Sequence, residues 1–224
     1  MESPARSIRF VHKAIQTEID ALDREVERLA AGDRDDAAEM ARRFDFFYQV
    51  VKAHEDGEED TFFPAVDERV YPVSAPYLLD HQADQGHIRE LSQSLGLLAG
   101  NPDGRTRSEI LRRAKRLTTI LDGATAIHIQ KEEAILLPLI EQNFSFAEQE
   151  DLTKRAVAHV PPEVMQQMFP WLVGSLATDD QEAFLRDMMQ LVPPNVFHMM
   201  SGLLATNLPP DQWAEIVRRL PEAA

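Results

Sequence analysis

The feature that most limits how this chain can fold is a motif that occurs twice. The stretches 54–67 and 128–141 both follow the pattern H-x-x-x-E-E-x-x-x-x-P-x-x-[DE]. On an α-helix, residues four positions apart lie on the same face. Each copy therefore predicts a helix that presents an imidazole and a carboxylate on one side. Two such helices facing each other would supply two half-sites for a metal.

Hydrophobic residues spaced by three and four predict four amphipathic helices, between about residues 3 and 32, 40 and 58, 74 and 100, and 106 and 135. Ser3-Pro4 and Ser74-Ala75-Pro76 are helix starts, and Gly32-Asp33-Arg34-Asp35 and Gly100-Asn101-Pro102 are stops. Thr106 to Glu109 reads as a capping box. The predicted core positions of the fourth helix are Ile110, Ala114, Leu117, Leu121, Ala124, His128, Glu132 and Ile135. Short connections favour an all-α, up-down-up-down four-helix bundle.

Six polar side chains occupy positions where this pattern calls for apolar ones. A single histidine in a core is more often hydrogen-bonded than a metal ligand. Six unpaired polar groups together would cost several kcal/mol each, more than a typical domain's stability of ~5–15 kcal/mol. A metal centre removes that cost. The six candidate ligands are His12, His54, Glu58, His81, His128 and Glu132.

The order of these residues predicts an internal symmetry. A lone histidine precedes each His-Glu pair, so the bundle reads as two helical hairpins related by a pseudo-two-fold axis. Pro64 and Pro138 each follow their motif histidine by ten residues, which predicts a kink or an end at matching places. Four imidazoles and two carboxylates suit two iron ions, with manganese and zinc as alternatives.

Composition excludes several other classes. Among 224 residues, 23 Lys and Arg stand against 38 Asp and Glu, a net charge of 23 − 38 = −15, which argues against nucleic acid as a partner. With no Cys, disulfides, zinc-thiolate sites and thiol nucleophiles are excluded. No apolar run approaches the ~20 residues of a membrane span and no leader is visible. We expect a cytoplasmic protein with no membrane partner.

The arrangement H…H-x-x-x-E…H…H-x-x-x-E over residues about 8–143 resembles the hemerythrin-like (HHE cation-binding) family. The resemblance implies a four-helix bundle with a non-haem di-iron centre that binds or reacts with dioxygen, peroxide or nitric oxide, or senses iron and oxygen. It makes His12 and His54 terminal ligands of one iron and His81 and His128 those of the other. Glu58 and Glu132 become carboxylate bridges, alongside an oxo or hydroxo bridge.

Three stretches are similar to the hemerythrin-like domains of plant iron-sensing ubiquitin ligases: KAHEDGEEDTFFPA, YLLDHQ and FPWLVGSLATDDQ. Those ligases carry Cys-rich zinc modules, whereas this chain has no Cys. The resemblance therefore does not transfer ligase activity.

For other residues near the motifs, the sequence also predicts which could be ligands and which belong to the surface or the core. Oxygen-carrying hemerythrins have H-x-x-x-H on the third helix, but here Gln85 follows His81 at i+4, with Asp84 on the core side. An iron with one fewer imidazole favours turnover or sensing over oxygen storage. Glu55, Asp84 and Gln85 remain open as additional ligands. We expect solvated or surface positions for Glu59, Glu133 and His87, and core packing for most of Phe44, Phe46, Phe47, Tyr48, Phe62 and Phe63.

The chain changes character near residue 144, which predicts a bundle over 1–143 and an extension of short helices over 144–224. Segments 161–186 and 193–218 repeat with a period of 32 residues, and a half copy precedes them. Ser145 to Glu148 and Thr178 to Gln181 read as capping boxes. A Met-rich face suggests an adaptable surface that packs on the bundle, forms a homodimer or binds a protein partner. His159 and His198 are not expected to be ligands.

Three functions fit these features. The first is a di-iron protein that reacts with dioxygen or peroxide, either as an oxidoreductase or as a sensor. The second is an iron- or gas-binding module that signals through its C-terminal helices without turnover. The third is an interaction scaffold in which the His-Glu set is only structural.

Overall fold

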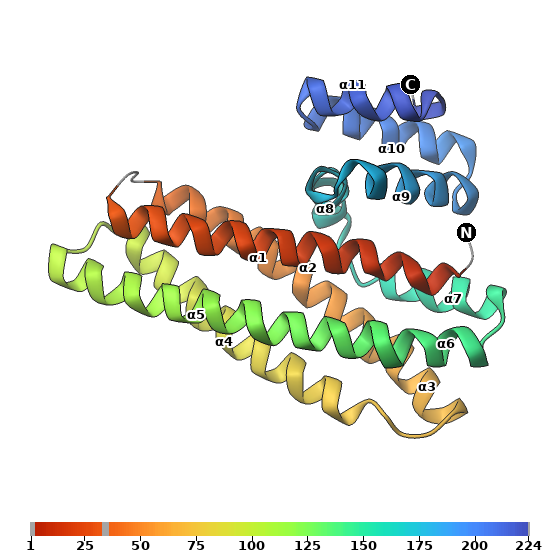
Figure 1. Cartoon of the computed structure of the whole chain (residues 1–224), viewed down its shortest axis with the longest axis horizontal. Helices are drawn as coiled ribbons and strands as arrows, with labels where there is room; N and C mark the ends of the chain where they lie inside the picture. The colour runs from red at the N-terminus through yellow and green to blue at the C-terminus, as the bar shows by residue number, and fades with distance from the viewer. Residues whose placement is uncertain (1–2, 33–35, 224) are drawn as a thin grey trace.

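Four long antiparallel helices form the body of the molecule. The structure is a computed structural model that describes residues 3–32 and 36–223, and these residues contain helices and no strand. The bundle consists of α1 (Ile8–Ala31), α2 (Ala37–Gly57), α4 (Ala75–Ala99) and α5 (Gly104–Lys131). Consecutive helices run in opposite directions, α1 lies against α5, and α2 lies against α4 (Figure 1). The predicted up-down-up-down bundle is confirmed.

The bundle helices begin and end close to the predicted places. A short 3₁₀ turn (η1, Pro4–Ser7) leads into α1, which ends at Gly32 with a φ of 79°, a left-handed conformation that glycine adopts without strain. Asp33, Arg34 and Asp35 lie outside the described residues. The capping box predicted at Thr106 is wrong, because α5 starts earlier and Asp103 accepts a hydrogen bond from the Thr106 amide at 2.9 Å.

The two long helices that carry the repeated motif each contain a π-helical turn. Residues Glu58–Phe62 (η2) connect α2 to α3 (Phe63–Arg69), and residues Glu132–Leu136 (η3) connect α5 to α6 (Leu137–Asn143). Proline has no amide hydrogen, and its ring clashes with the carbonyl four residues earlier, which here lies inside each π turn. The wider turn accommodates Pro64 and Pro138 without ending the helix. The two interruptions fall at matching places, as predicted, but the helices continue past Pro64 and Pro138 as α3 and α6 and do not end there.

The π turn in the second motif also changes which residues face the core. A π turn inserts one extra residue into the helical repeat, so positions beyond it rotate relative to an uninterrupted helix. Ile135, predicted as a core residue, is 49% exposed, whereas Leu136, Leu137 and Ile140 are buried. The assignment of Ile135 to the core was therefore wrong by one position.

The main core of the bundle contains Ile15, Ile19, Leu22 and Leu29 from α1, with Phe44 and Phe47 from α2. It continues with Leu91, Leu95 and Leu98 from α4 and Leu117 and Leu121 from α5. Burial of this apolar surface is the main force that aligns the four helices. Ile15 and Phe47 of this core lie beside His54 and His128, so the core packs directly against the polar residues.

The C-terminal extension consists of short helices whose positions repeat. They are α7 (Phe146–Val157), α8 (Pro162–Ser175), α9 (Thr178–Leu191), α10 (Pro194–Asn207) and α11 (Pro210–Arg219), followed by a short turn η4 (Pro221–Ala223). Helices α8 and α10 start 194 − 162 = 32 residues apart. Helices α7, α9 and α11 start at residues 146, 178 and 210, again 32 apart. The predicted repeat is confirmed.

A buried glutamine in the first turn of α7 and of α9 makes a similar contact in each unit. Gln149 donates to the carbonyl of Phe144 at 2.8 Å, and Gln181 donates to the carbonyl of Val173 at 2.9 Å. Each amide thus satisfies a carbonyl of the helix or turn that comes before it. The capping box at Ser145 is present, whereas the one predicted at Thr178 is not, because Thr178 already lies inside α9.

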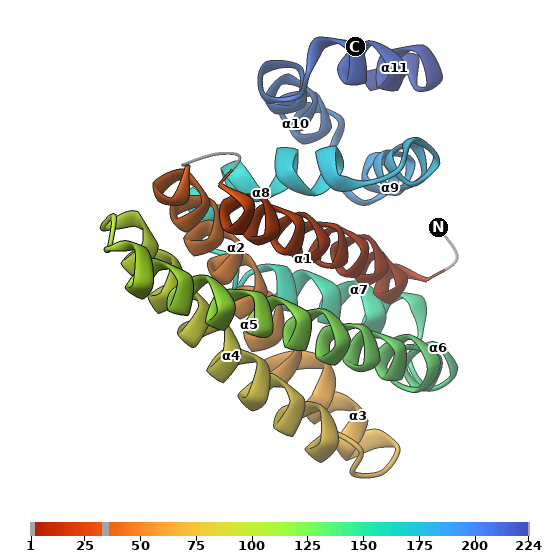
Figure 2. The same cartoon turned by 60° about the vertical axis from the view of Figure 1, so that its left-hand side comes forward.

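The extension covers one side of the bundle. Helix α7 packs against α2 and η2, and α8 packs against α1 and α2. Helix α9 lies beside α8 and also contacts α1, where the ring centroids of Phe10 and Phe184 are 5.2 Å apart. Helices α10 and α11 lie farther from the bundle (Figures 1 and 2). Gly57 lies so close to α7 that a Cβ there would be 2.8 Å from the backbone oxygen of Ala156. His159, after α7, adds a contact of 3.0 Å between its Nε2 and Asp60 Oδ2 in η2.

The predicted division between residues 143 and 144 falls in the short connection between α6, which ends at Asn143, and α7, which begins at Phe146. None of the helices in the described part of the chain is both long enough and apolar enough to span a membrane.

Candidate metal centre

The six predicted ligands converge from four helices at one end of the bundle. His12 comes from α1, His54 from α2, His81 from α4 and His128 from α5, while Glu58 and Glu132 are the first residues of the two π turns. They form two groups of four whose possible ligand atoms lie within 4.8 Å of one another. The groups are His12, His54, Glu58 and Glu132, and Glu58, His81, His128 and Glu132. The two glutamates belong to both groups.

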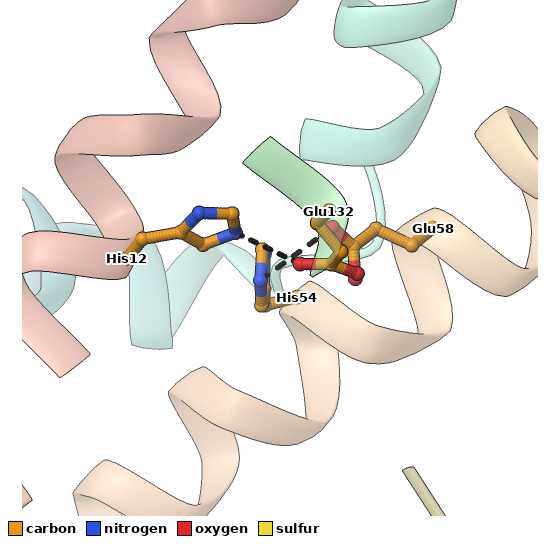
Figure 3. Close-up of side chains that lie close together, drawn as sticks. All are labelled: His12, His54, Glu58 and Glu132. Carbon is orange, nitrogen blue, oxygen red and sulfur yellow. Dashed lines mark ion pairs between the residues drawn. The ribbon is translucent and has the colours of Figure 1, made fainter. Parts of the chain in front are cut away.

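Each shared carboxylate lies between histidines from the two hairpins. Glu132 has one oxygen 3.2 Å from Nε2 of His12 and the other 3.1 Å from Nε2 of His128. Glu58 has one oxygen 3.6 Å from Nε2 of His54 and the other 3.6 Å from Nε2 of His81. In Figure 3, the rings of His12 and His54 point toward the two carboxylates. The arrangement has the two-fold character that the sequence order predicts.

The polar atoms at the centre of this cluster are buried without hydrogen-bond partners among the described residues. They are Nε2 of His12, both carboxylate oxygens of Glu58 and both of Glu132. Although several lie at ion-pair distance from one another, their orientation does not make hydrogen bonds. Buried polar atoms are rarely left in this state, because each costs free energy. Nitrogen and oxygen donors that converge without partners fit a bound metal ion.

Three of the histidines are held from behind by carboxylates. Glu133 Oε1 lies 3.1 Å from Nδ1 of His12, and Glu59 Oε1 lies 2.9 Å from Nδ1 of His81. Asp80 Oδ2 lies 3.1 Å from Nδ1 of His128. A carboxylate that accepts from Nδ1–H leaves the Nε2 lone pair free and directs it inward, an arrangement typical of metal-binding histidines.

The expectation that Glu59 and Glu133 are only solvated was therefore wrong. Both are partly exposed, yet each contacts the lone histidine of the other hairpin. The two consecutive glutamates of each motif have different roles. The first carboxylate faces the centre, and the second orients the imidazole ring of the lone histidine on the other hairpin. The repeated Glu-Glu pair was visible in the sequence and could have signalled this. No pattern singled out Asp80, which also pairs with Lys131.

His54 differs from the other three histidines. Among the described residues, no carboxylate lies behind its Nδ1, and its side chain is 11% exposed, the highest value of the six. On the opposite side of the centre, Phe63 stacks on the His81 ring with a centroid distance of 5.5 Å. Phe44 and Phe47 lie in the bundle core, as expected for most of the aromatic cluster.

Burial and charge give the histidines different protonation tendencies without metal. Burial and the nearby His12 lower the pKa of His54 to about 3. Burial would also lower the pKa of His128, but contacts with Glu132 and Asp80 outweigh it and raise that pKa to about 9. Burial and repulsion from Glu132 raise the pKa of Glu58. Metal binding requires neutral imidazoles and ionised carboxylates, so it would release protons from this cluster.

The residues left open as additional ligands lie outside the two groups. Glu55 accepts a hydrogen bond from the Gln85 amide, and burial raises the pKa of the Glu55 carboxyl to about 8. Asp84 is buried, and burial raises its pKa. His87, expected at the surface, is only partly exposed and its Nδ1 is buried.

A four-helix bundle in which four histidines and two shared glutamates converge defines a helical metal-binding protein. Comparison with known families gives the same class: the Hemerythrin HHE cation binding domain matches residues 3–140. This chain belongs to that family, and it is a metal-cation-binding protein.

Individual relatives cover most of this chain but only a small part of their own length. The zinc finger protein BRUTUS of Arabidopsis thaliana is 27% identical over 191 residues, which are 85% of this chain and 15% of that protein. Two BRUTUS-like zinc finger proteins of the same plant are also 27% identical, over 197 and 183 residues, and this chain covers 15% and 14% of them. No solved structure matches significantly. The chain thus spans about one seventh of these curated relatives.

Proposed function

We propose that this chain binds two iron ions, each in one of the two groups of four, and that it binds or reacts with dioxygen or peroxide. His12 and His54 would hold one ion, His81 and His128 the other, and Glu58 and Glu132 would bridge them. The observation that carries the proposal is the sharing of both buried carboxylates by the two groups. A shared pair of carboxylates suits two ions better than one.

The donor set supports iron over other metals. Four imidazoles and two carboxylates form a mixed nitrogen and oxygen environment, with no thiolate in the chain. Iron bound in such a site supplies redox chemistry with small oxygen species. The protein's own contribution is to hold the six groups in place, to orient three rings through Glu59, Asp80 and Glu133, and to exclude bulk water by burial.

The first test is metal content. Mass spectrometry of the purified protein should find close to two irons per chain, and the near-ultraviolet and visible spectrum should change when peroxide is added. His54→Ala combined with His128→Ala removes one imidazole from each group and should abolish metal binding. His198→Ala, at an exposed position on α10, is the matched control. Wild-type protein without iron, or a double variant that keeps its metal, would contradict the proposal.

Turnover separates the enzyme from the sensor. An oxidoreductase should consume peroxide at many equivalents per iron-loaded chain, whereas a sensor should stop after about one. The scaffold hypothesis instead predicts that the double variant leaves both fold and metal content unchanged.

One structural feature favours the sensor as a second candidate. The π turn η2, which contains Glu58, packs directly against α7 of the extension. Gly57 and Asp60, on either side of Glu58, contact Ala156 and His159. A change at the metal centre could therefore reach the extension, and with it a homodimer or protein partner. Iron-dependent protection of α7 to α11 from proteolysis would support this role, and equal cleavage with and without iron would oppose it.

A further inference from the structure

A cavity of about 270 Å³ lies between the bundle and the extension. Its walls come from α1 and α2 of the bundle and from α7, α8, α9 and α10 of the extension. His54 and Glu58 lie on the same wall, so the cavity reaches the edge of the candidate metal centre. This contact also accounts for His54 being the most exposed of the six ligand candidates.

The rest of the lining is almost entirely apolar. Four methionines line it, Met165, Met168, Met188 and Met200, together with aliphatic and phenylalanine side chains. Methionine side chains are flexible and polarizable, so such a wall adapts to ligands of different shape. Apart from His54 and Glu58, one further polar group matters: the hydroxyl of Thr153 is buried and has no hydrogen-bond partner among the described residues.

The volume limits the size of a ligand. An apolar cavity of ~150 Å³ holds benzene, so simple scaling gives roughly eleven non-hydrogen atoms for this one. The described residues that line the cavity include no lysine or arginine. A buried anionic head group would therefore lack a counter-charge and is disfavoured. A neutral oxygen-bearing head could hydrogen-bond to an otherwise unpartnered group while its hydrocarbon tail contacts the methionines.

We propose that this cavity binds a medium-chain, unbranched alkyl compound with one neutral oxygen-bearing head group. The head lies toward His54 and Glu58, and the tail lies between the bundle and the extension. The inference deepens the proposed function, since it names the class of organic molecule that reaches the metal centre. Binding of the tail depends only on the cavity, so it is expected with and without metal.

The primary test is calorimetric titration of the full chain with 1-alcohols of six to fourteen carbons. Burial of each added methylene should tighten binding about fourfold. The gain should stop near roughly ten carbons, where the cavity is full. Decanoate, which has the same chain length as 1-decanol and an anionic head, should bind more weakly. Binding that does not depend on chain length would overturn the proposal, and equal binding of decanoate would overturn its neutral-head part.

A second measurement locates the ligand. In protein with ¹³C-labelled methionine methyl groups, 1-decanol should shift the signals of Met165, Met168, Met188 and Met200. The signals of Met40, Met189 and Met199, which do not line the cavity, should stay in place. Shifts confined to the second set would refute the assignment.

Variants complete the test. Ala156→Leu places three extra carbons at the wall and should weaken 1-decanol binding about tenfold or more. Ala205→Leu makes the same change at an exposed position of α10 and should have no effect. Met188→Phe is the second cavity variant if Ala156→Leu does not fold. Metal content is measured in the wild type and in each variant. Weaker alcohol binding by a cavity variant that keeps its metal supports the cavity site, whereas unchanged alcohol binding by both cavity variants refutes it. A wild-type protein without metal counts only against the proposed function.

Discussion

Replacing Gly57 by alanine tests whether the extension packs on the metal-binding motif. Gly57 has ordinary helical angles, φ −62° and ψ −40°, so its backbone does not require glycine. In the second copy of the motif the same position is Lys131. An alanine Cβ at position 57 would lie 2.8 Å from the oxygen and 3.2 Å from the carbonyl carbon of Ala156. Both are backbone atoms, so α7 itself would have to move.

Two opposing effects determine how much Gly57→Ala changes the free energy of unfolding. Replacing glycine by alanine inside a helix gains about 0.8–1 kcal/mol. Overpacking against a fixed backbone costs about 1–3 kcal/mol. Gly57→Ala should therefore lower the free energy of unfolding by about 0–2 kcal/mol. Gly123→Ala, in α5 with no atom within 4 Å of the added Cβ, should raise it by about 1 kcal/mol.

Thermal unfolding of metal-free protein measures the difference. The two variants should differ by about 1–3 kcal/mol, which for a chain of this size corresponds to roughly 3–9 °C in Tm. Metal-free protein is used so that a change in metal affinity does not enter the comparison. If Gly57→Ala raised Tm as much as Gly123→Ala does, the close approach of α7 would not exist in solution and the reasoning would be refuted.

Three further changes test other parts of the structure. Glu133→Gln weakens the acceptor behind His12 and should reduce metal affinity by about 10–100-fold, measured by competition with a chelator; Glu68→Gln, at an exposed site, should not. Asp67 accepts three hydrogen bonds from residues 73 and 74, which hold its pKa below the ordinary 3.8. Asp67→Asn should cost about 1–2 kcal/mol at neutral pH, measured by urea unfolding. Gln181→Ala leaves a buried carbonyl unpaired and should cost about 1–3 kcal/mol in the same assay.

The pH dependence of the Asp67 variant has a defined sign. A carboxyl whose pKa is lower in the folded chain stabilises the fold above its ordinary pKa. That contribution disappears as the pH falls through the lowered value. The difference between wild type and Asp67→Asn should therefore be full at pH 7 and disappear as the pH falls through the lowered pKa of Asp67. A difference that is independent of pH would mean that the charge of Asp67 is not involved.

Much of the bundle could be predicted because its determinants are local. The 3.6-residue spacing of apolar side chains specifies an amphipathic helix wherever it occurs, and glycine and proline mark the residues at which the helices end. The convergence of His12, His54, His81 and His128 followed from the cost of burying polar groups singly. The prediction failed where a helix departs from the regular repeat, as at Ile135, where the π turn rotates the following residues by about one position.

The partners of side chains were harder to predict. Glu59 and Glu133 looked like surface residues because each lies next to an inward-facing glutamate on its own helix. They contact His81 and His12 on other helices. Such a contact depends on how two helices are placed relative to each other, and spacing within one helix does not contain that information.

The sequence by itself determined the helices, the core of the bundle and the six polar residues that share one end of it. Helical periodicity and the free energy of burying polar groups act on each segment separately, so one sequence was enough. Only the tertiary structure decided which carboxylate holds which imidazole, why position 57 is glycine, and that a cavity lies beside His54. These features arise between segments that are distant along the chain, where packing geometry sets the distances between atoms.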